Sequence, residues 1–148
     1  MSLFRAARLA VAIAALAPSF SGCAIFTELD DPLGRHASLK LNQREYTQAI
    51  RWGEIEEASE FVDPELRPAF LEKSTAFAGF RITDYQIGRL DYDEADSNTA
   101  HVAVTYRGYY TASLVEQPIR ERQQWHRESG NDWQVRPDFD LPIGQVKR

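Results

Sequence analysis

The apolar residues of this chain change their spacing once, near Gly79, and this change constrains the fold more than any other feature. Before Gly79, apolar side chains recur at the three- and four-residue spacing of amphipathic helices. After it they alternate with polar ones, most cleanly in residues 99–113, as in half-buried strands. Helices followed by long strands with tight turns predict an α+β fold, with N-terminal helices packed on one face of a curved antiparallel sheet of about four strands.

The helical part is predicted to cover residues 38–79, within a domain that we expect to span 38–137. Its apolar stripes are Tyr46, Ala49 and Ile50; Ile55, Ala58, Phe61 and Val62; and Phe70, Ser74 and Phe77. Gly53 separates the first two stripes, Pro64 or Pro68 opens the third segment, and Gly79 is a plausible C-terminal cap.

The strand part is predicted to contain residues 80–93, 99–113, 118–128 and 133–136. Gly88-Arg89 is the expected place of a bulge in the first strand, because the apolar parity changes there. Pro137 is expected to stop the last strand, which leaves residues 138–148 as a tail. In the third strand Ile119, Glu121, Gln123 and Trp125 share one parity.

The N-terminus has the three parts of a secretory signal peptide, predicted to cover residues 1–22. Arg5 and Arg8 precede the apolar run 9–17, and small residues follow that run. The run is far shorter than the roughly 20 residues that a membrane-spanning helix needs. We therefore expect no transmembrane segment in the mature chain.

The end of this signal, Phe20-Ser21-Gly22-Cys23, resembles the lipobox of bacterial lipoproteins, although Phe20 stands where that family usually has Leu. The resemblance implies cleavage before Cys23, a diacylglycerol on its thiol and a third acyl chain, such as palmitate, on its new amine. Several acyl chains hold a protein on a bilayer almost permanently. The partner so implied is a membrane, with residues 23–37 forming the lipidated cysteine and a linker.

Charge and the residue after the cysteine bear on where the protein works. Ala24 stands where an Asp would resemble an inner-membrane retention signal, so the resemblance favours the outer membrane, facing the periplasm. The net charge of -5 predicts no nucleic-acid partner.

The mature chain also resembles the nuclear transport factor 2-like superfamily over roughly residues 38–137. The resemblance rests on the helical opening with Trp52-Gly53-Glu54-Ile55, the long strands and the closing Gly-Asn-Asp-Trp-Gln-Val hairpin. It implies a cone-shaped domain with a pocket between helices and sheet. A cystatin-like sheet with fewer helices is the alternative. Members of the superfamily include enzymes, binders and adaptors, so the fold does not choose a function.

The sequence offers few groups for chemistry. A phosphate-binding glycine loop, a serine nucleophile motif and a short-spaced set of metal ligands are missing, which predicts no cofactor and no metal. His36 falls in the expected linker, and His101 and His126 fall on strand faces that we expect to meet solvent. The acidic residues Glu54, Glu56, Glu57 and Glu60 are expected to form a solvated helix face.

Glu121 is the candidate catalytic residue, because its parity is expected to place it inside, with a raised pKa, beside Tyr85 or Tyr106. The alternative is a structural pair with an arginine such as Arg107. Tyr85, Tyr106, Gln123 and Trp125 are candidates for lining a pocket, although aromatic residues on strands usually belong to a core.

Three functions remain open from the sequence. The leading hypothesis is a non-enzymatic lipoprotein that binds an envelope protein or a small apolar ligand. The alternatives are a small acid–base enzyme of the isomerase or dehydratase type using Glu121 with a tyrosine, and a structural homo-oligomer, such as a homodimer, joined through the convex face of the sheet.

Overall fold

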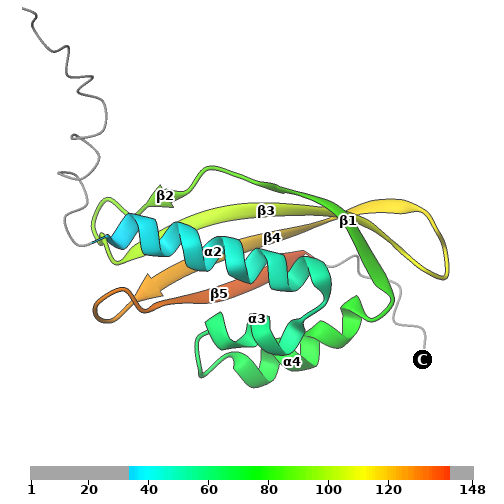
Figure 1. Ribbon diagram of the computed structural model, residues 1–148, viewed down its shortest axis with the longest axis horizontal. Helices are drawn as coiled ribbons and strands as arrows, with labels where there is room; N and C mark the ends of the chain where they lie inside the picture. The colour runs from blue at the N-terminus through cyan, green and yellow to red at the C-terminus, as the bar shows by residue number, and fades with distance from the viewer. Residues whose placement is uncertain (1–33, 141–148) are drawn as a thin grey trace, which may run out of the picture. The chain divides into compact units, whose positions relative to one another are not determined.

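The computed structural model describes residues 34–140, which fold as helices followed by strands (Figure 1). The elements are α2 (Arg35–Trp52), α3 (Ile55–Phe61), α4 (Arg67–Ser74), the 3-10 turn η1 (Thr75–Phe77), β1 (Phe80–Ile87), β2 (Asp91–Tyr92), β3 (Thr99–Tyr110), β4 (Glu116–Arg127) and β5 (Trp133–Asp140). This order confirms the predicted α+β class. The predicted signal peptide, Cys23, most of the linker and the tail from residue 141 lie outside the described residues.

The strands form one antiparallel sheet in the order β1-β3-β4-β5, with β2 pairing with β3. The α-helices lie on one side of this sheet, with α2 running along it and α3 and α4 beside β5 (Figure 1). Three helices cover the sheet in the described part of the chain, so the alternative with fewer helices does not fit.

The core lies between α2 and the inward side of the sheet, as the alternation predicts. Ala100, Val102, Val104 and Tyr106 of β3 are buried, whereas His101 and Ala103 between them and Arg107 after them are exposed. The apolar faces of the helices form the other side of the core. Their buried side chains include Leu39, Tyr46, Ala49, Ile50, Ala58, Val62 and Phe70.

Helix α2 ends as predicted but begins earlier. At its end Gly53 adopts a left-handed conformation (φ 76°), and the backbone N–H groups of Gly53 and Glu54 donate to Ile50 and Ala49. At its start the helix includes residues 35–37, which the sequence predicts as part of the linker. Tertiary contacts hold this first turn: Trp133 Nε1 donates to the Arg35 carbonyl (3.2 Å), and the His36 ring lies 4.3 Å from that of Tyr92.

The predicted strand 80–93 shifts its pairing with β3 by one residue at two places. One shift lies at residues 88–90, because Ile87 pairs with Val104 and Asp91 with His101, and it confirms the bulge predicted at Gly88-Arg89. The other lies at Thr83 and was not predicted. Ile82 pairs with Gly108 and Asp84 with Arg107, so Thr83 is the extra residue. Gly88 still donates its N–H to the Ala103 carbonyl (2.8 Å) at the end of β1. The chain then leaves the ladder and returns as β2 against the same strand.

The last strand continues through Pro137 to Asp140, which corrects the predicted end of the domain. Pro137 pairs with Gln123, and Asp140 with Arg120. Strand β5 is at the end of the strand order, where the missing N–H of a proline is tolerated. Phe139, predicted to be in the tail, therefore belongs to the folded domain and packs against the core cluster.

Candidate functional site

A fully buried carboxyl group is the most unusual feature of the core. Glu121 on β4 has no exposed surface. Its Oε1 accepts a hydrogen bond from the Tyr46 hydroxyl of α2 (2.6 Å), and its Oε2 accepts from the Tyr106 hydroxyl of β3 (2.8 Å) and from Gln123 Nε2 (2.7 Å). Two tyrosines and one amide thus satisfy both carboxyl oxygens.

Burial raises the pKa of Glu121 from 4.5 to about 7, because the charged form loses its hydration. The hydrogen bonds from Tyr46, Gln123 and Tyr106 act in the opposite direction and limit the shift. Burial, followed by the nearby Glu121 carboxyl, also raises the pKa of both tyrosines. The hydroxyl groups therefore remain donors near neutral pH.

The network extends along β4 and back to α2. Trp125 Nε1 donates to Gln123 Oε1 (3.1 Å), and Gln43 Nε2 donates to Thr47 Oγ1 (3.0 Å). All four side chains are buried. The hydrogen bonds connect the helix to the sheet through polar groups, each of which has a partner inside the protein.

The predicted site residues do come together in space. Tyr106, Gln123 and Trp125 surround or extend the Glu121 network, and the ring of half-buried Tyr85 lies 6.4 Å from that of Tyr106. The predicted pair between Glu121 and Arg107 is wrong. Arg107 is exposed and lies opposite Pro118, on the other face of the sheet.

An apolar pocket lies elsewhere, between α3, α4 and β5, and has a volume of about 70 Å³. Its lining is Ile50, Ile55, Leu66, Ala69, Phe70, Lys73, Ser74, Phe77, Pro137 and Phe139. The Phe70 ring separates this pocket from the Glu121 network, since it lies 6.5 Å from the ring of Tyr46 and 6.4 Å from that of Phe139. The resemblance implied a pocket between helices and sheet, but sequence reasoning named none of the residues that line this one, although the Phe70–Ser74–Phe77 stripe was a signal for them.

A wider hollow of about 500 Å³ adjoins the apolar pocket. The two share Ile50, Ile55, Ser74 and Phe77 in their linings. The wider hollow is bounded further by Arg51 and Trp52 at the end of α2 and by the first residues of β1. Because Ile50, Ile55, Ser74 and Phe77 line both, the two cavities lie side by side. Together they are called the joined depression, which has an apolar end and a polar end.

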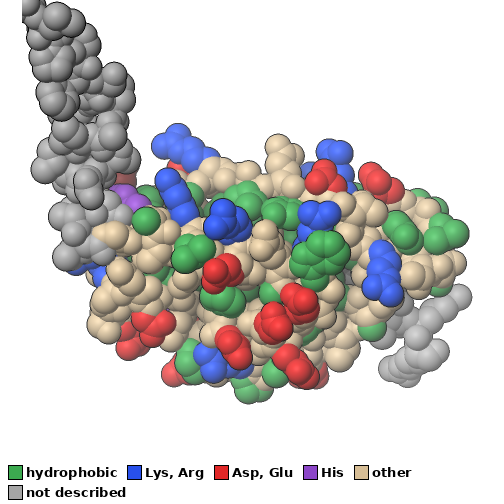
Figure 2. Space-filling view, in the orientation of Figure 1, with side chains coloured by type: hydrophobic (Ala, Val, Ile, Leu, Met, Phe, Trp, Pro, Cys, Tyr) green, Lys and Arg blue, Asp and Glu red, His purple; other side chains and the backbone are tan. Residues whose placement is uncertain are grey.

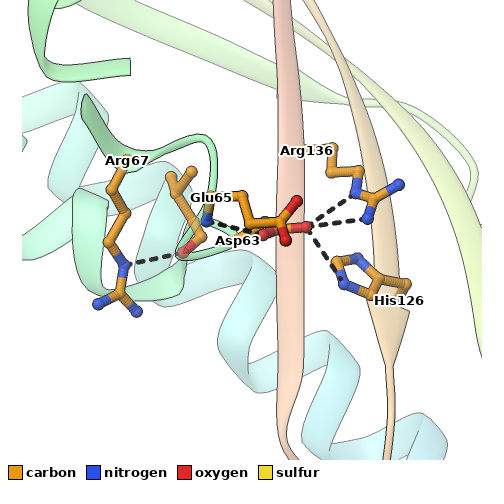
Figure 3. Close-up of polar contacts among 6 residues, drawn as sticks. Asp63, Glu65, Arg67, His126 and Arg136 are labelled. Atoms are coloured by element: carbon orange, nitrogen blue, oxygen red, sulfur yellow. Dashed lines mark hydrogen bonds and ion pairs between the residues drawn. The ribbon is translucent and has the colours of Figure 1, made fainter. Parts of the chain in front are cut away.

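A second polar cluster joins the α3–α4 connection to the sheet (Figure 3). Asp63 Oδ2 accepts from Arg136 Nε (3.0 Å) and lies 3.6 Å from His126 Nε2, while Oδ1 accepts from the Glu65 N–H (3.0 Å). Burial opposes ionisation of Asp63, but these hydrogen bonds and the charges of Arg136 and His126 outweigh it and lower the pKa.

This cluster corrects the prediction for His126. We expected the side chain to face solvent, but it is only 21% exposed because the Asp63 segment lies against it. The Asp63 N–H also donates to the Val135 carbonyl (3.0 Å), so the cluster holds the segment on the edge strand. Its contacts are those of a structural clamp.

The remaining acidic residues behave as the sequence predicts. Glu54, Glu56, Glu57 and Glu60 are exposed, and acidic side chains gather over the region of α3 (Figure 2). Among residues 34–140, no group of three or more His, Cys, Asp and Glu side chains is placed to hold a metal ion. No helix in the same range is both long and apolar enough to cross a membrane.

Comparisons with known proteins show no family for this chain. No family model matches the chain, and no curated protein matches it. One solved structure that is similar, from Silicibacter sp. tm1040, is described as a "putative polyketide cyclase". It is 12% identical, with a TM-score of 0.48, and the match covers 70% of this chain and 90% of that one.

Proposed function

We propose that this protein is a lipid-anchored module of the bacterial cell envelope and that its domain binds a small apolar ligand without catalysing a reaction. The apolar pocket between α3, α4 and β5 carries this proposal. Small-molecule sites are concave, mostly apolar and equipped with a few polar groups, and this pocket combines aliphatic and aromatic side chains with Lys73 and Ser74 at its border.

The state of Glu121 supports binding over catalysis. A general acid or base must come within hydrogen-bond reach of its substrate. Glu121 has no exposed surface, both of its oxygens are engaged inside the protein, and it is not among the residues that line the apolar pocket.

Acid–base catalysis by Glu121 with Tyr46 or Tyr106 is the second candidate function, because a pKa of about 7 suits proton transfer near neutral pH. It requires the Phe70 wall to open so that a substrate reaches the carboxyl group. Turnover of a candidate substrate that survives in Glu121→Gln would remove this candidate.

In this proposal, acylated Cys23 is the membrane anchor of the protein, and the protein lies on the outer membrane, facing the periplasm. Replacing Cys23 with Ala removes the thiol that would carry the diacylglycerol, so we expect the protein to move from the membrane to the soluble fraction. Fractionation of cells that express either form measures this. Retention of Cys23→Ala in the membrane fraction would contradict the anchor, and Ser21→Ala is the control that leaves the thiol in place.

The pocket is tested by filling it. Ser74 lines both the apolar pocket and the wider hollow, so we expect Ser74→Phe to displace about two methylene groups of a ligand and to weaken binding of 1-octanol about tenfold. Calorimetric titration of the acylated protein in nanodiscs, with protein-free nanodiscs subtracted, measures the affinity.

The matched control is Ser113→Phe, since both serines hydrogen-bond to the carbonyl three residues earlier but Ser113 is exposed in the β3–β4 turn. Equal affinities of the two variants, or no binding of 1-octanol by the unmodified protein, would refute the pocket as the binding site.

A further inference from the structure

The charges around the joined depression differ from those of the protein as a whole. The chain carries a net charge of -5, yet the described residues that line the apolar pocket and the wider hollow include Lys73, Arg51 and Arg81 and no Asp or Glu. The apolar end therefore adjoins a polar end whose charged residues are all positive. This pairing of surfaces is complementary to a molecule with a hydrocarbon part and an anionic head.

Arg51 is the cation that the structure holds in place. Its Nη2 donates to the Thr83 carbonyl of β1 (3.3 Å), and its guanidinium carbon lies 5.2 Å from the centre of the Trp52 ring and 5.5 Å from that of Tyr85. Because these contacts fix the guanidinium group before a ligand arrives, less freedom is lost on binding. Lys73 has an exposed side chain at the other border.

The hydrogen-bonding capacity of Arg51 is also incompletely used. Among the described residues its guanidinium group makes one hydrogen bond, from Nη2 to the Thr83 carbonyl. Its Nε is buried, so a ligand in the hollow would meet the Nη1 and Nη2 groups, which keep further N–H donors. A planar guanidinium binds a carboxylate through two parallel hydrogen bonds, which makes this pair stronger than a neutral one.

We propose that the ligand of the depression is a single-chain carboxylate, a fatty acid, with its hydrocarbon end among Ile55, Phe77 and Phe139 and its carboxylate at Arg51. The inference rests on the proposed function, because it assigns the chemical class of the ligand to the same depression. The small volume of the apolar pocket favours one chain over the two chains of a phospholipid.

The test compares molecules of one chain length that differ in the head group: octanoate, 1-octanol and octyltrimethylammonium. Each is titrated calorimetrically into the mature acylated protein in phosphatidylcholine nanodiscs, with protein-free nanodiscs subtracted. We expect octanoate to bind about tenfold more tightly than 1-octanol, and octyltrimethylammonium to bind more weakly than both, because a charge-assisted hydrogen bond exceeds a neutral one.

The variant Arg51→Gln is expected to bring octanoate and 1-octanol to within about twofold of each other, a loss of most of the tenfold preference. Arg44→Gln, an exposed position on the same helix, is the control that keeps the preference. Unchanged melting temperatures show that each variant is folded, and Arg51→Lys distinguishes a bidentate contact from a simple charge, since a lysine restores only part of the preference.

The outcomes separate the two proposals. Binding of 1-octanol without any preference for octanoate would overturn the carboxylate inference and leave the proposed function intact, whereas no binding of either would overturn both. A lysophosphatidic acid with an eight-carbon chain that binds more tightly than octanoate would show that the head group is a phosphate, which also overturns the carboxylate assignment.

Discussion

Between about pH 4.5 and pH 8 the unmodified protein is expected to lose about 3 kcal/mol of stability relative to Glu121→Gln. The folded state raises the pKa of Glu121 from 4.5 to about 7, so folding binds a proton that the unfolded chain releases in this range. Stability from this group is complete below pH 4.5 and is lost as the pH rises through 7. The expected loss of about 3 kcal/mol follows from the difference between the two pKa values, because each tenfold change in proton affinity corresponds to about 1.4 kcal/mol.

Urea unfolding of both proteins at a series of pH values measures the difference. The glutamine of the variant does not titrate, and the hydroxyls of Tyr46 and Tyr106 can rotate to donate to its oxygen or accept from its amide. Asp63 does not contribute in this window, because its pKa is lowered and its stabilisation is lost only as the pH falls below 3.8. If the free energies of unfolding of the two proteins change in parallel from pH 4.5 to pH 8, the pKa of Glu121 is not raised by folding, which would contradict its burial.

Gly108→Ala is expected to destabilise the domain by about 3 kcal/mol. A Cβ at Gly108 would clash with the Arg81 carbonyl oxygen and lie 2.8 Å from the Phe80 ring, at the place where β1 pairs closely with β3 beside the bulge at Thr83. The obstacle is backbone, so the strand itself would have to move.

Gly53→Ala is the control for this second prediction. It also replaces a glycine, but nothing lies within 4 Å of its Cβ position, and only its left-handed conformation (φ 76°) is unfavourable. We expect a cost of about 1–2 kcal/mol there. Unfolding midpoints at constant pH compare the two, and a cost at Gly108 no larger than that at Gly53 would contradict the close approach of β1 to β3.

The strand alternation was the most informative part of the sequence. It correctly predicted that Tyr106 and Glu121 face inward and that His101 faces outward, because the side-chain direction of a strand follows its parity. It did not predict Tyr46 as a partner of Glu121, since these residues are 75 positions apart and meet only when α2 packs on the sheet.

The errors arose where tertiary contacts outweigh local signals. Pro137 is a strong stop signal, but pairing with β4 at an edge position carries the strand through it. That error removed Phe139 from the predicted domain, and with it one wall of the apolar pocket. His126 was predicted to be exposed because the sequence near it does not indicate that the Asp63 segment lies against it.

The most direct test of the central claim is a crystal structure of the protein grown with 8-bromo-1-octanol, in which anomalous scattering locates the bromine. The proposed function predicts a bromine peak in the apolar pocket, beside Ile55, Phe77 and Phe139. A peak confined to the outer face of the sheet, or no peak at saturating ligand, would contradict it.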